Sequence, residues 1–538
     1  MSPLWGLRHN GREEGREDGD EEEYVGETGR PDNRRRAQDV DERTRLLPAE
    51  GNGYLHPDDP AVSPYNLWSV RALRGLTLTV LFISLLWWIL LLISIFVSPP
   101  GMSNRGSGFF DFSFTTLTIS NLLIALIFFA IPSTPMTIWA TTLSVLLSVS
   151  LFLMLGVPRL RIEEGWVGIA SAAWAVVISL YLVAQTRLVA QGKRQEEERL
   201  TGREETRRSL AEWLAILVQI IVMAVTVLVG ILLMSTLSLR AKDATLEAPG
   251  QRYYVDSNKY QVHLHCIGGD HSTLKNSNET TVTVLLEGGE SPVEYTFQKW
   301  VDEAYQHGVI KRYCYWDRPG IAWSDNAPSP HSAGMSADAL SEALAMADEE
   351  GPWVVVSAGV GGIYSRIFAS RHLRDIHGIM LIDTLHEDLL HNLGKPGRGL
   401  MLWIWGILSP LGIDRLAGAI FKGRTRADRV CGMRAYQGGK FIKAELQESL
   451  VADSITRSEI SSARHIQSPS TPLVVVSSGK EVRRSQTWAD KQEDLTKITK
   501  NLVAWDVVKG APHQVWDTLD GRRTLEKRLG ELVKQAKH

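Results

Sequence analysis

Five long apolar runs constrain this chain more than any other feature of its sequence. Each is close to the ~20 residues that a helix needs to cross about 30 Å of hydrocarbon. No ionisable residue interrupts them, which disfavours a proton relay or an ion path. The sequence therefore predicts a five-span membrane region over residues 67–240. The runs lie at about Leu76–Val97, Phe112–Ile131, Thr137–Val157, Trp166–Gln185 and Trp213–Leu237.

The short loops predict an orientation. The loop after the first run has a single basic residue, Arg105, and the loop after the third run has two, Arg159 and Arg161. Basic residues favour the cytosolic side, so we expect the more basic loop before the fifth run and the N-terminus to face the cytosol. An odd number of spans then places the chain after Leu237 on the lumenal or external side. The basic residues of that loop are Arg187, Lys193, Arg194, Arg199, Arg203, Arg207 and Arg208.

Residues 1–66 are rich in charge and glycine and are expected to be a disordered cytosolic tail, because such a segment buries too little apolar surface to fold. Within this tail, Glu42 lies four residues before Leu46 and Leu47, a spacing that resembles an acidic dileucine sorting signal. One alternative is that this segment is a signal that directs the protein to a vacuole-like or lysosome-like membrane. The other is that it is part of a disordered tail with no sorting role. The many acidic residues disfavour a mitochondrial matrix transit peptide.

From about Ala241 the pattern changes to strands that alternate with helices, which predicts a mostly parallel sheet covered by helices. We expect eight strands over residues 241–538, the first two forming an antiparallel hairpin. Residues from about 384 to 469 break the rhythm and predict a helical lid. Within it, Leu400–Leu408 is too short to span a bilayer, and is either lid core or a surface resting on the membrane. The strands are Arg252–Asp256, Gln261–Cys266, Thr281–Leu286, Lys311–Tyr315, Trp353–Val356, Gly378–Ile382, Pro472–Val476 and Val503–Val508.

The stretch from Trp353 to Tyr364 joins an apolar strand directly to a helix through a cluster of glycines. Such a sharp turn is typical of the nucleophile elbow, in which the middle residue of a GxSxG pattern is exposed at the top of the sheet. Aligned with that pattern, the nucleophile position falls on Gly359. Ser357 lies two residues earlier and is expected to end the strand rather than point into a pocket.

These residues resemble the α/β-hydrolase superfamily, over roughly Arg252 to Lys534. The segments Tyr315–Asp325 and Leu381–His386 look like the family's YDRxGxGxSD and LVDxxH segments. The resemblance implies an α/β-hydrolase fold with an eight-stranded, mostly parallel sheet and a helical lid. The whole arrangement of tail, spans and domain also resembles fungal multi-pass proteins labelled mitochondrial integral membrane proteins.

The family's strand order would make the strands of Cys266 and Cys314 neighbours, so a disulfide would form in an oxidising lumen. The alternative is that all three cysteines, which include Cys431, are buried apolar residues. They are too few and too scattered for a disulfide framework or a zinc site. We therefore expect no metal site, and we expect no cofactor.

The resemblance also assigns catalytic positions. It implies a histidine at His513, in the loop after the last strand, and an acid at Glu481 after the seventh strand or at Asp383 after the sixth. The oxyanion hole would use the backbone N–H of Val360. Gly359 supplies no hydroxyl, so the route through an acyl-enzyme is closed.

A second oxyanion N–H would come from the loop at Gly288 and Gly289. The favoured interpretation is a non-catalytic pseudo-hydrolase domain that binds membrane lipids, a small hydrophobic ligand or a protein partner. One alternative is an enzyme without a serine nucleophile that uses His513 as a base. Another is a transporter-like or membrane-organising protein with a regulatory soluble domain. The net charge of -3 excludes a generally basic nucleic-acid binder, and the sequon at Asn278 predicts a glycoprotein if this part is lumenal.

Overall fold

The computed structural model describes residues 65–536, except residues 66, 103, 130, 203–209 and 270–281. The predicted sorting residues Glu42, Leu46 and Leu47 and the predicted glycosylation site Asn278 lie outside the described residues. From Pro57 onward the chain forms a single unit by its internal contacts.

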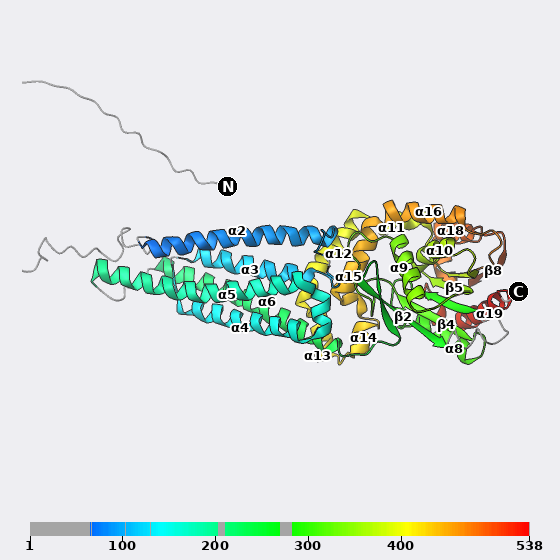
Figure 1. The fold of residues 1–538 in the computed structure, drawn as a ribbon, viewed down its shortest axis with the longest axis horizontal. Helices are drawn as coiled ribbons and strands as arrows, with labels where there is room; N and C mark the ends of the chain where they lie inside the picture. Colours follow the sequence, from blue (N-terminus) through cyan, green and yellow to red (C-terminus); the bar gives the residue numbers. More distant parts are fainter. Residues whose placement is uncertain are drawn as a thin grey trace, which may run out of the picture. The chain divides into compact units, whose positions relative to one another are not determined.

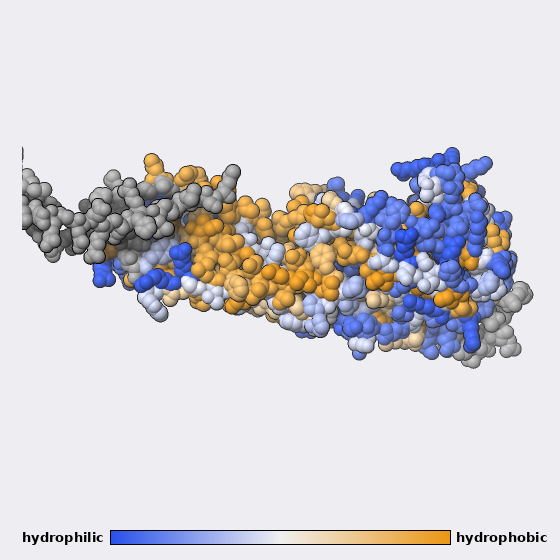
Figure 2. All heavy atoms as spheres, turned by 90° about the horizontal axis from the view of Figure 1, so that it is seen from above, coloured by the Kyte–Doolittle hydropathy of each residue, from blue (hydrophilic) through white to orange (hydrophobic). Residues whose placement is uncertain are grey.

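Five helices form a bundle, and each contains one of the five predicted apolar runs, in whole or in large part. All five are long and apolar enough to cross a membrane. Among the described residues, a sixth candidate arises only if the bent pair Pro396–Leu411 and Ile413–Phe421 counts as one span. Figure 2 shows hydrophobic residues covering this bundle, whereas hydrophilic residues gather over the α/β domain. The helices are α2 (Trp68–Phe96), α3 (Phe109–Ile127), α4 (Thr134–Gly156), α5 (Pro158–Thr201) and α6 (Leu210–Asp243).

Helix α5 is much longer than the run that predicted it. Arg187, Lys193, Arg194 and Arg199, which we expected in a loop, lie on the helix instead. The reason is local, since Glu, Gln, Lys and Arg are good helix formers and nothing between the apolar run and Gly202 stops the helix. Gly202 ends it in the left-handed conformation, with φ +66°.

The second half of the chain folds around an eight-stranded sheet, with one strand for each predicted strand. The strand order is β1-β2-β4-β3-β5-β6-β7-β8. The first two strands form the expected antiparallel hairpin, β2 is also antiparallel to β4, and the remaining pairs are parallel. This order, with an antiparallel second strand, is that of the α/β-hydrolase fold. The strands are β1 (Gln251–Val255), β2 (Tyr260–Gly268), β3 (Thr283–Glu287), β4 (Arg312–Asp317), β5 (Trp353–Ala358), β6 (Ile376–Ile382), β7 (Leu473–Ser478) and β8 (Leu502–Val508).

Helices cover both faces of the sheet. Alternate residues of a strand point to opposite faces, so Val355 packs into one core cluster and Val354 and Val356 into the other. The first cluster contains α9 (Ala333–Met346) and α10 (Gly361–Arg371), and the second contains α8 (Phe297–Gln306) and α19 (Leu519–Gln535). Cys266 lies opposite Cys314 in the β2–β4 register, and the two form a disulfide.

The lid fills the chain between β6 and β7. Its helices α12 and α15 lie between the sheet and the five-helix bundle, whereas α16 packs on α10 (Figure 1). Two glycines mark its contacts with the bundle. A Cβ at Gly406 would meet Phe109 of α3, and one at Gly412 would meet Thr236 of α6. The elements are η2 (Glu387–Leu389), α11 (Leu390–Leu393), α12 (Pro396–Leu408), η3 (Ser409–Leu411), α13 (Ile413–Phe421), α14 (Arg426–Val430), η4 (Ala435–Gln437), α15 (Gly439–Val451), η5 (Ala452–Thr456) and α16 (Arg457–Ile466).

Of the two roles considered for Leu400–Leu408, that of lid core is supported on one side of α12, and contact with a membrane stays a prediction. One side of the helix packs on α3 and α15. The other side exposes Leu400, Trp405 and Leu408. After the lid, β7 is followed by α17 (Gly479–Arg484) and α18 (Gln486–Leu495), and the loop after β8 contains η6 (Val515–Asp517).

Candidate functional site

The elbow has the predicted geometry. Strand β5 ends at Ala358, and α10 begins at Gly361. Gly359 lies between them with φ +51°, and its carbonyl accepts a hydrogen bond from the N–H of Leu385 at 2.9 Å. Ser357 is fully buried, and its Oγ accepts a hydrogen bond from Ser365 Oγ at 2.8 Å. As expected, Ser357 therefore does not stand in for the nucleophile.

The structure brings His513 and Asp383 together. The distance from His513 Nδ1 to Asp383 Oδ2 is 2.6 Å. The other carboxylate oxygen of Asp383 accepts hydrogen bonds from Ser478 N and Trp488 Nε1, both at 3.0 Å. Asp383 is completely buried and lies just after β6 with φ +46°. Three donors thus fix the carboxylate that orients the imidazole.

Glu481, the first acid candidate after the seventh strand, is not the partner of His513. It lies in the first turn of α17, where Ser478 Oγ accepts a hydrogen bond from its backbone N–H at 3.2 Å. Both ring nitrogens of His513 are already engaged by other carboxylates, one of them Asp383. Of the two acids that the sequence left open, Asp383 after β6 is therefore the one held beside Nδ1, and Glu481 is not.

The second carboxylate on His513 belongs to Glu290, a residue that sequence reasoning missed. Its Oε2 lies 3.3 Å from His513 Nε2, and its Oε1 accepts a hydrogen bond from Val360 N at 3.0 Å. A Cβ built on Gly359 would meet this carboxylate. Glu290 therefore occupies the space between the histidine and the predicted oxyanion donor, where a serine hydroxyl or a substrate oxygen would lie.

The two carboxylates set the charge state of His513. Burial alone would lower the pKa of its imidazole, but Asp383 and Glu290 raise that pKa to about 10. The Glu290 side chain is 57% exposed. Partial desolvation would raise the pKa of its carboxyl, but His513 and the N–H groups of Glu290 and Val360 hold that pKa below its usual value. At neutral pH His513 is an imidazolium that donates both N–H groups.

The glycine loop after β3 packs tightly against the elbow. A Cβ at Gly289 would lie 3.1 Å from the carbonyl oxygen of Ala358. The carbonyls of Gly288 and Gly289 accept hydrogen bonds from the guanidinium of Arg318, which is buried against Glu287 at 3.1 Å. Burial raises the pKa of Glu287 to about 7, although Arg318 counteracts this. Arg318 therefore fixes the loop that presents Glu290.

The cavity above this centre is small. It has a volume of about 80 Å³ and lies between the elbow and the lid. Small-molecule sites usually enclose about 300–1,000 Å³, so this cavity does not accommodate a lipid. Its lining includes Glu290, Arg318, Val360, Leu385, Arg398 and Phe441.

Two sequence comparisons relate the chain to fungal proteins. An uncharacterized protein of Schizosaccharomyces pombe is 35% identical over 537 residues, covering 92% of this chain and 97% of that protein. The chain belongs to the same family. This chain is also similar to an uncharacterized vacuolar membrane protein of Saccharomyces cerevisiae. The two are 28% identical over 335 residues, which cover 54% of this chain and 52% of that protein. Residues 42–266 match the family model described as "Region of unknown function (DUF2417)".

Among solved structures, the domain is similar to a carboxylesterase of Nitrososphaera gargenis, at 13% identity and a TM-score of 0.37, over 53% of this chain and 99% of that one. It is also similar to the Cif epoxide hydrolase of Acinetobacter nosocomialis, at 13% identity and a TM-score of 0.39, over 56% and 96%. The fold assignment for this family member rests on its own strand order and elbow.

Proposed function

We propose that this protein is a membrane-anchored, non-catalytic α/β-hydrolase-like protein whose second half acts as a binding module. One observation carries the proposal. The Glu290 carboxylate accepts a hydrogen bond from the Val360 N–H and also contacts Nε2 of His513. It thus lies where the reaction of a hydrolase would occur. The reaction centre is filled by the protein's own anion, and Gly359 offers no nucleophile.

The same geometry disfavours an enzyme that works without serine. A general base must present a lone pair at the operating pH. His513 instead donates from both nitrogens, because Asp383 and Glu290 raise the pKa of its imidazole to about 10. An imidazolium has no lone pair with which to take a proton from water, so His513 does not act as the base in this state.

We propose the vacuolar membrane as the location, with the α/β domain on the lumenal side. The label of the Saccharomyces cerevisiae relative supports the vacuole over a mitochondrial membrane. The positive-inside bias supports the lumenal side. The disulfide between Cys266 and Cys314 is also consistent with an oxidising compartment. Glycosylation at Asn278 would follow from that topology.

The test is labelling of the full-length, detergent-purified protein with a fluorophosphonate probe. We expect no labelling of the wild type. Gly359→Ser alone should label poorly, because its side chain would meet the Glu290 carboxylate. Gly359→Ser combined with Glu290→Ala should label, since the hydroxyl then faces His513 and a free Val360 N–H.

The control for this series is Ser357→Ala in the double-variant background. It should leave labelling unchanged, because Ser357 is buried and bonded to Ser365. Adding His513→Ala to the double variant should abolish labelling. Labelling of the wild type that disappears in His513→Ala would show an active serine and overturn the proposal.

A further inference from the structure

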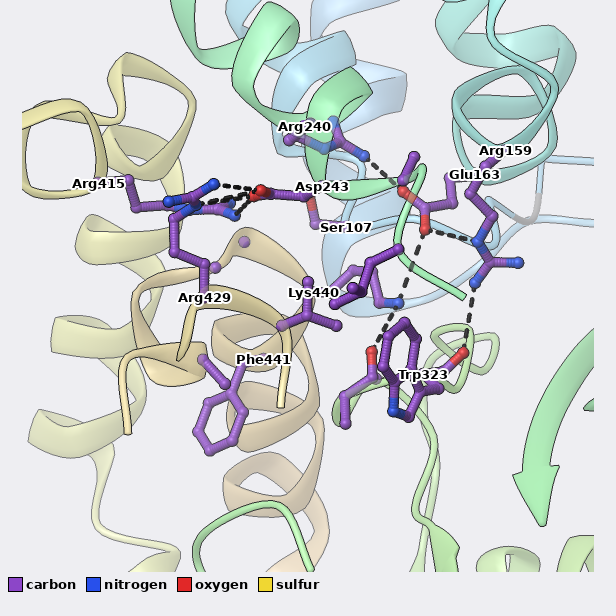
Figure 3. A pocket seen from close by; sticks show the side chains of 18 of the residues that line it. Ser107, Arg159, Glu163, Arg240, Asp243, Trp323, Arg415, Arg429, Lys440 and Phe441 are labelled. Carbon is purple, nitrogen blue, oxygen red and sulfur yellow. Dashed lines mark hydrogen bonds and ion pairs between the residues drawn. The ribbon is translucent and has the colours of Figure 1, made fainter. Parts of the chain in front are cut away.

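A second cavity lies where the lid meets the first residues of α5 and the last residues of α6. Its volume is about 120 Å³. Phe441 lines both this cavity and the smaller one beside Glu290. Figure 3 shows two groups of charged side chains facing it, one around Asp243 and one around Glu163. Six of the described residues that line it are cationic, namely Arg159, Arg240, Arg252, Arg415, Arg429 and Lys440.

In the first group, two arginines of the lid share one carboxylate at the end of α6. Arg429 Nη2 lies 2.5 Å from Asp243 Oδ1, and Arg415 Nη2 lies 3.0 Å from Asp243 Oδ2. Arg429 is only 4% exposed. One negative charge therefore serves two guanidinium groups that are shielded from water.

In the second group, three cations share Glu163 of α5. Its carboxylate lies 3.0 Å from Arg159, 2.8 Å from Arg240 and 3.7 Å from Lys440. Two further carboxylates complete this group. Glu164 pairs with Arg240 at 2.5 Å, and Asp325 pairs with Arg159 at 2.6 Å. Five of the six cations thus share four carboxylates, whereas Arg252 makes no ion pair among the described residues. The six cations exceed these four carboxylates by two charges.

Two of the arginines have donors that no group satisfies among the described residues. Arg252 Nε and Arg415 Nε are both buried without a hydrogen-bond partner. Burial lowers the pKa of Arg415 to about 10, Asp243 counteracts this, and Arg240 and Arg429 lower it further. Burial likewise lowers the pKa of Lys440 to about 8. Cations that repel one another around a cavity, with donors to spare, form a site for an anion.

An apolar groove begins beside this cavity. Its volume is about 600 Å³, and it runs along the bent lid segment formed by α12, η3 and α13. Ser409 and Arg415 line both the groove and the cavity. The same lid segment contacts α3 and α6 of the bundle. A charged cavity beside an apolar groove, with two lining residues in common, matches a molecule with an anionic head and an apolar tail. The apolar lining residues are Leu402, Trp405, Leu408, Leu411, Ile413 and Ile442.

We propose that this junction binds an anionic phospholipid, with its phosphate in the cavity and an acyl chain in the groove. The planar forks of the arginines fit phosphate oxygens, and a phosphate would balance the excess positive charge. The proposal goes beyond the function proposed above and stands whether or not the Gly359 centre is silent. Labelling and lipid binding are separate measurements and can fail separately.

The experiment titrates the full-length protein in a neutral detergent with three probes and follows thermal unfolding by tryptophan fluorescence. The probes are dioctanoyl phosphatidic acid, dioctanoyl phosphatidylcholine and inorganic phosphate. We expect phosphatidic acid to raise the unfolding midpoint saturably. The other two should bind at least about tenfold more weakly, since phosphatidylcholine carries no net negative charge and inorganic phosphate has no acyl chain.

Arg252→Gln is the main variant, because it removes a cation and an unsatisfied donor without breaking one of the ion pairs that surround the cavity. It should weaken phosphatidic acid binding by about tenfold. Leu408→Gln, at an exposed position of the groove, should weaken lipid binding and leave phosphate binding unchanged. The matched control is Arg457→Gln, which alters an exposed ion pair on the lid and should bind as the wild type does.

Three results would overturn the proposal. Equal binding of phosphatidylcholine would show that the site does not recognise the net negative charge of the lipid. Equal binding of inorganic phosphate would show that the groove takes no part and that the ligand is not a lipid. Unchanged phosphatidic acid binding in Arg252→Gln and in the milder Arg415→Lys would place the lipid elsewhere.

Discussion

Lys443 gives a prediction in which both the sign and the size follow from the structure. It lies on α15, is 5% exposed and donates a hydrogen bond to the carbonyl of Ile95 at the end of α2. Its neighbours Ile442 and Leu446 belong to an apolar cluster. Burial lowers the pKa of its ammonium from 10.5 to about 7. Lys443→Met should therefore stabilise the fold in a pH-dependent way.

The sign follows from proton binding. Between pH 7 and pH 10 the unfolded lysine keeps its proton while the folded one loses it, so the stability of the wild type rises with pH in this window. A pKa fall from 10.5 to about 7 corresponds to a penalty of about 5 kcal/mol below pH 7, of which about 2 kcal/mol remains at pH 9. The free-energy gain of Lys443→Met should therefore shrink by about 3 kcal/mol from pH 5 to pH 9.

The assay is thermal unfolding of the two full-length proteins in detergent at pH 5, 7 and 9. The Ile95 carbonyl loses its donor in Lys443→Met at every pH, so this loss shifts all three comparisons equally. Lys497→Met, at a position that is 62% exposed, is the control and should show no change with pH. A midpoint difference between Lys443→Met and the wild type that stays constant from pH 5 to pH 9 would refute the reasoning.

Three further predictions test other parts of the structure. Gly412→Ala should lower the unfolding midpoint more than Gly423→Ala, because both have φ near +58°, but only the Cβ at position 412 would meet Thr236. Alkylation of the denatured protein should modify only Cys431 without reductant and all three cysteines after reduction. Glu290→Gln should lower the pKa of His513, so that carbethoxylation of the His513 peptide, followed by mass spectrometry, begins at a lower pH than in the wild type.

Much of the fold could be predicted because its signals are local. The β-branched run beginning at Trp353 and the glycines after it specify a strand and a sharp turn within twelve residues. The five apolar runs are equally self-contained. The continuation of α5 to Thr201 was missed, because hydropathy reports where a helix is apolar and not where it stops. Local strand patterns do not show that β2 pairs antiparallel with β4, since strand direction depends on contacts between distant residues.

The site was less predictable because its geometry depends on which loops meet. Asp383 and Glu481 both follow a strand, and only the packing of Trp488 and Ser478 around Asp383 separates them. One feature of the sequence could have pointed to Glu290 as a residue of the site. It directly follows Gly288 and Gly289, so an acidic side chain stands in the loop whose backbone should receive negative charge. The sequence alone does not show that this carboxylate folds back onto Val360.

The two cavities differ in how many carboxylates are paired with each buried cation. At the elbow, His513 has two carboxylates of its own, Asp383 and Glu290. The arginines that line the cavity are also paired with carboxylates, Arg318 with Glu287 and Glu448 and Arg398 with Glu445, so no described cation there lacks a counter-ion. At the lid–bundle junction, Arg415 and Arg429 share only Asp243. A buried cation without its own counter-ion destabilises a fold, and its retention requires a compensating interaction. Among the described residues, recognition of an anion is therefore favoured at the junction with the bundle and disfavoured at the site inherited from hydrolases.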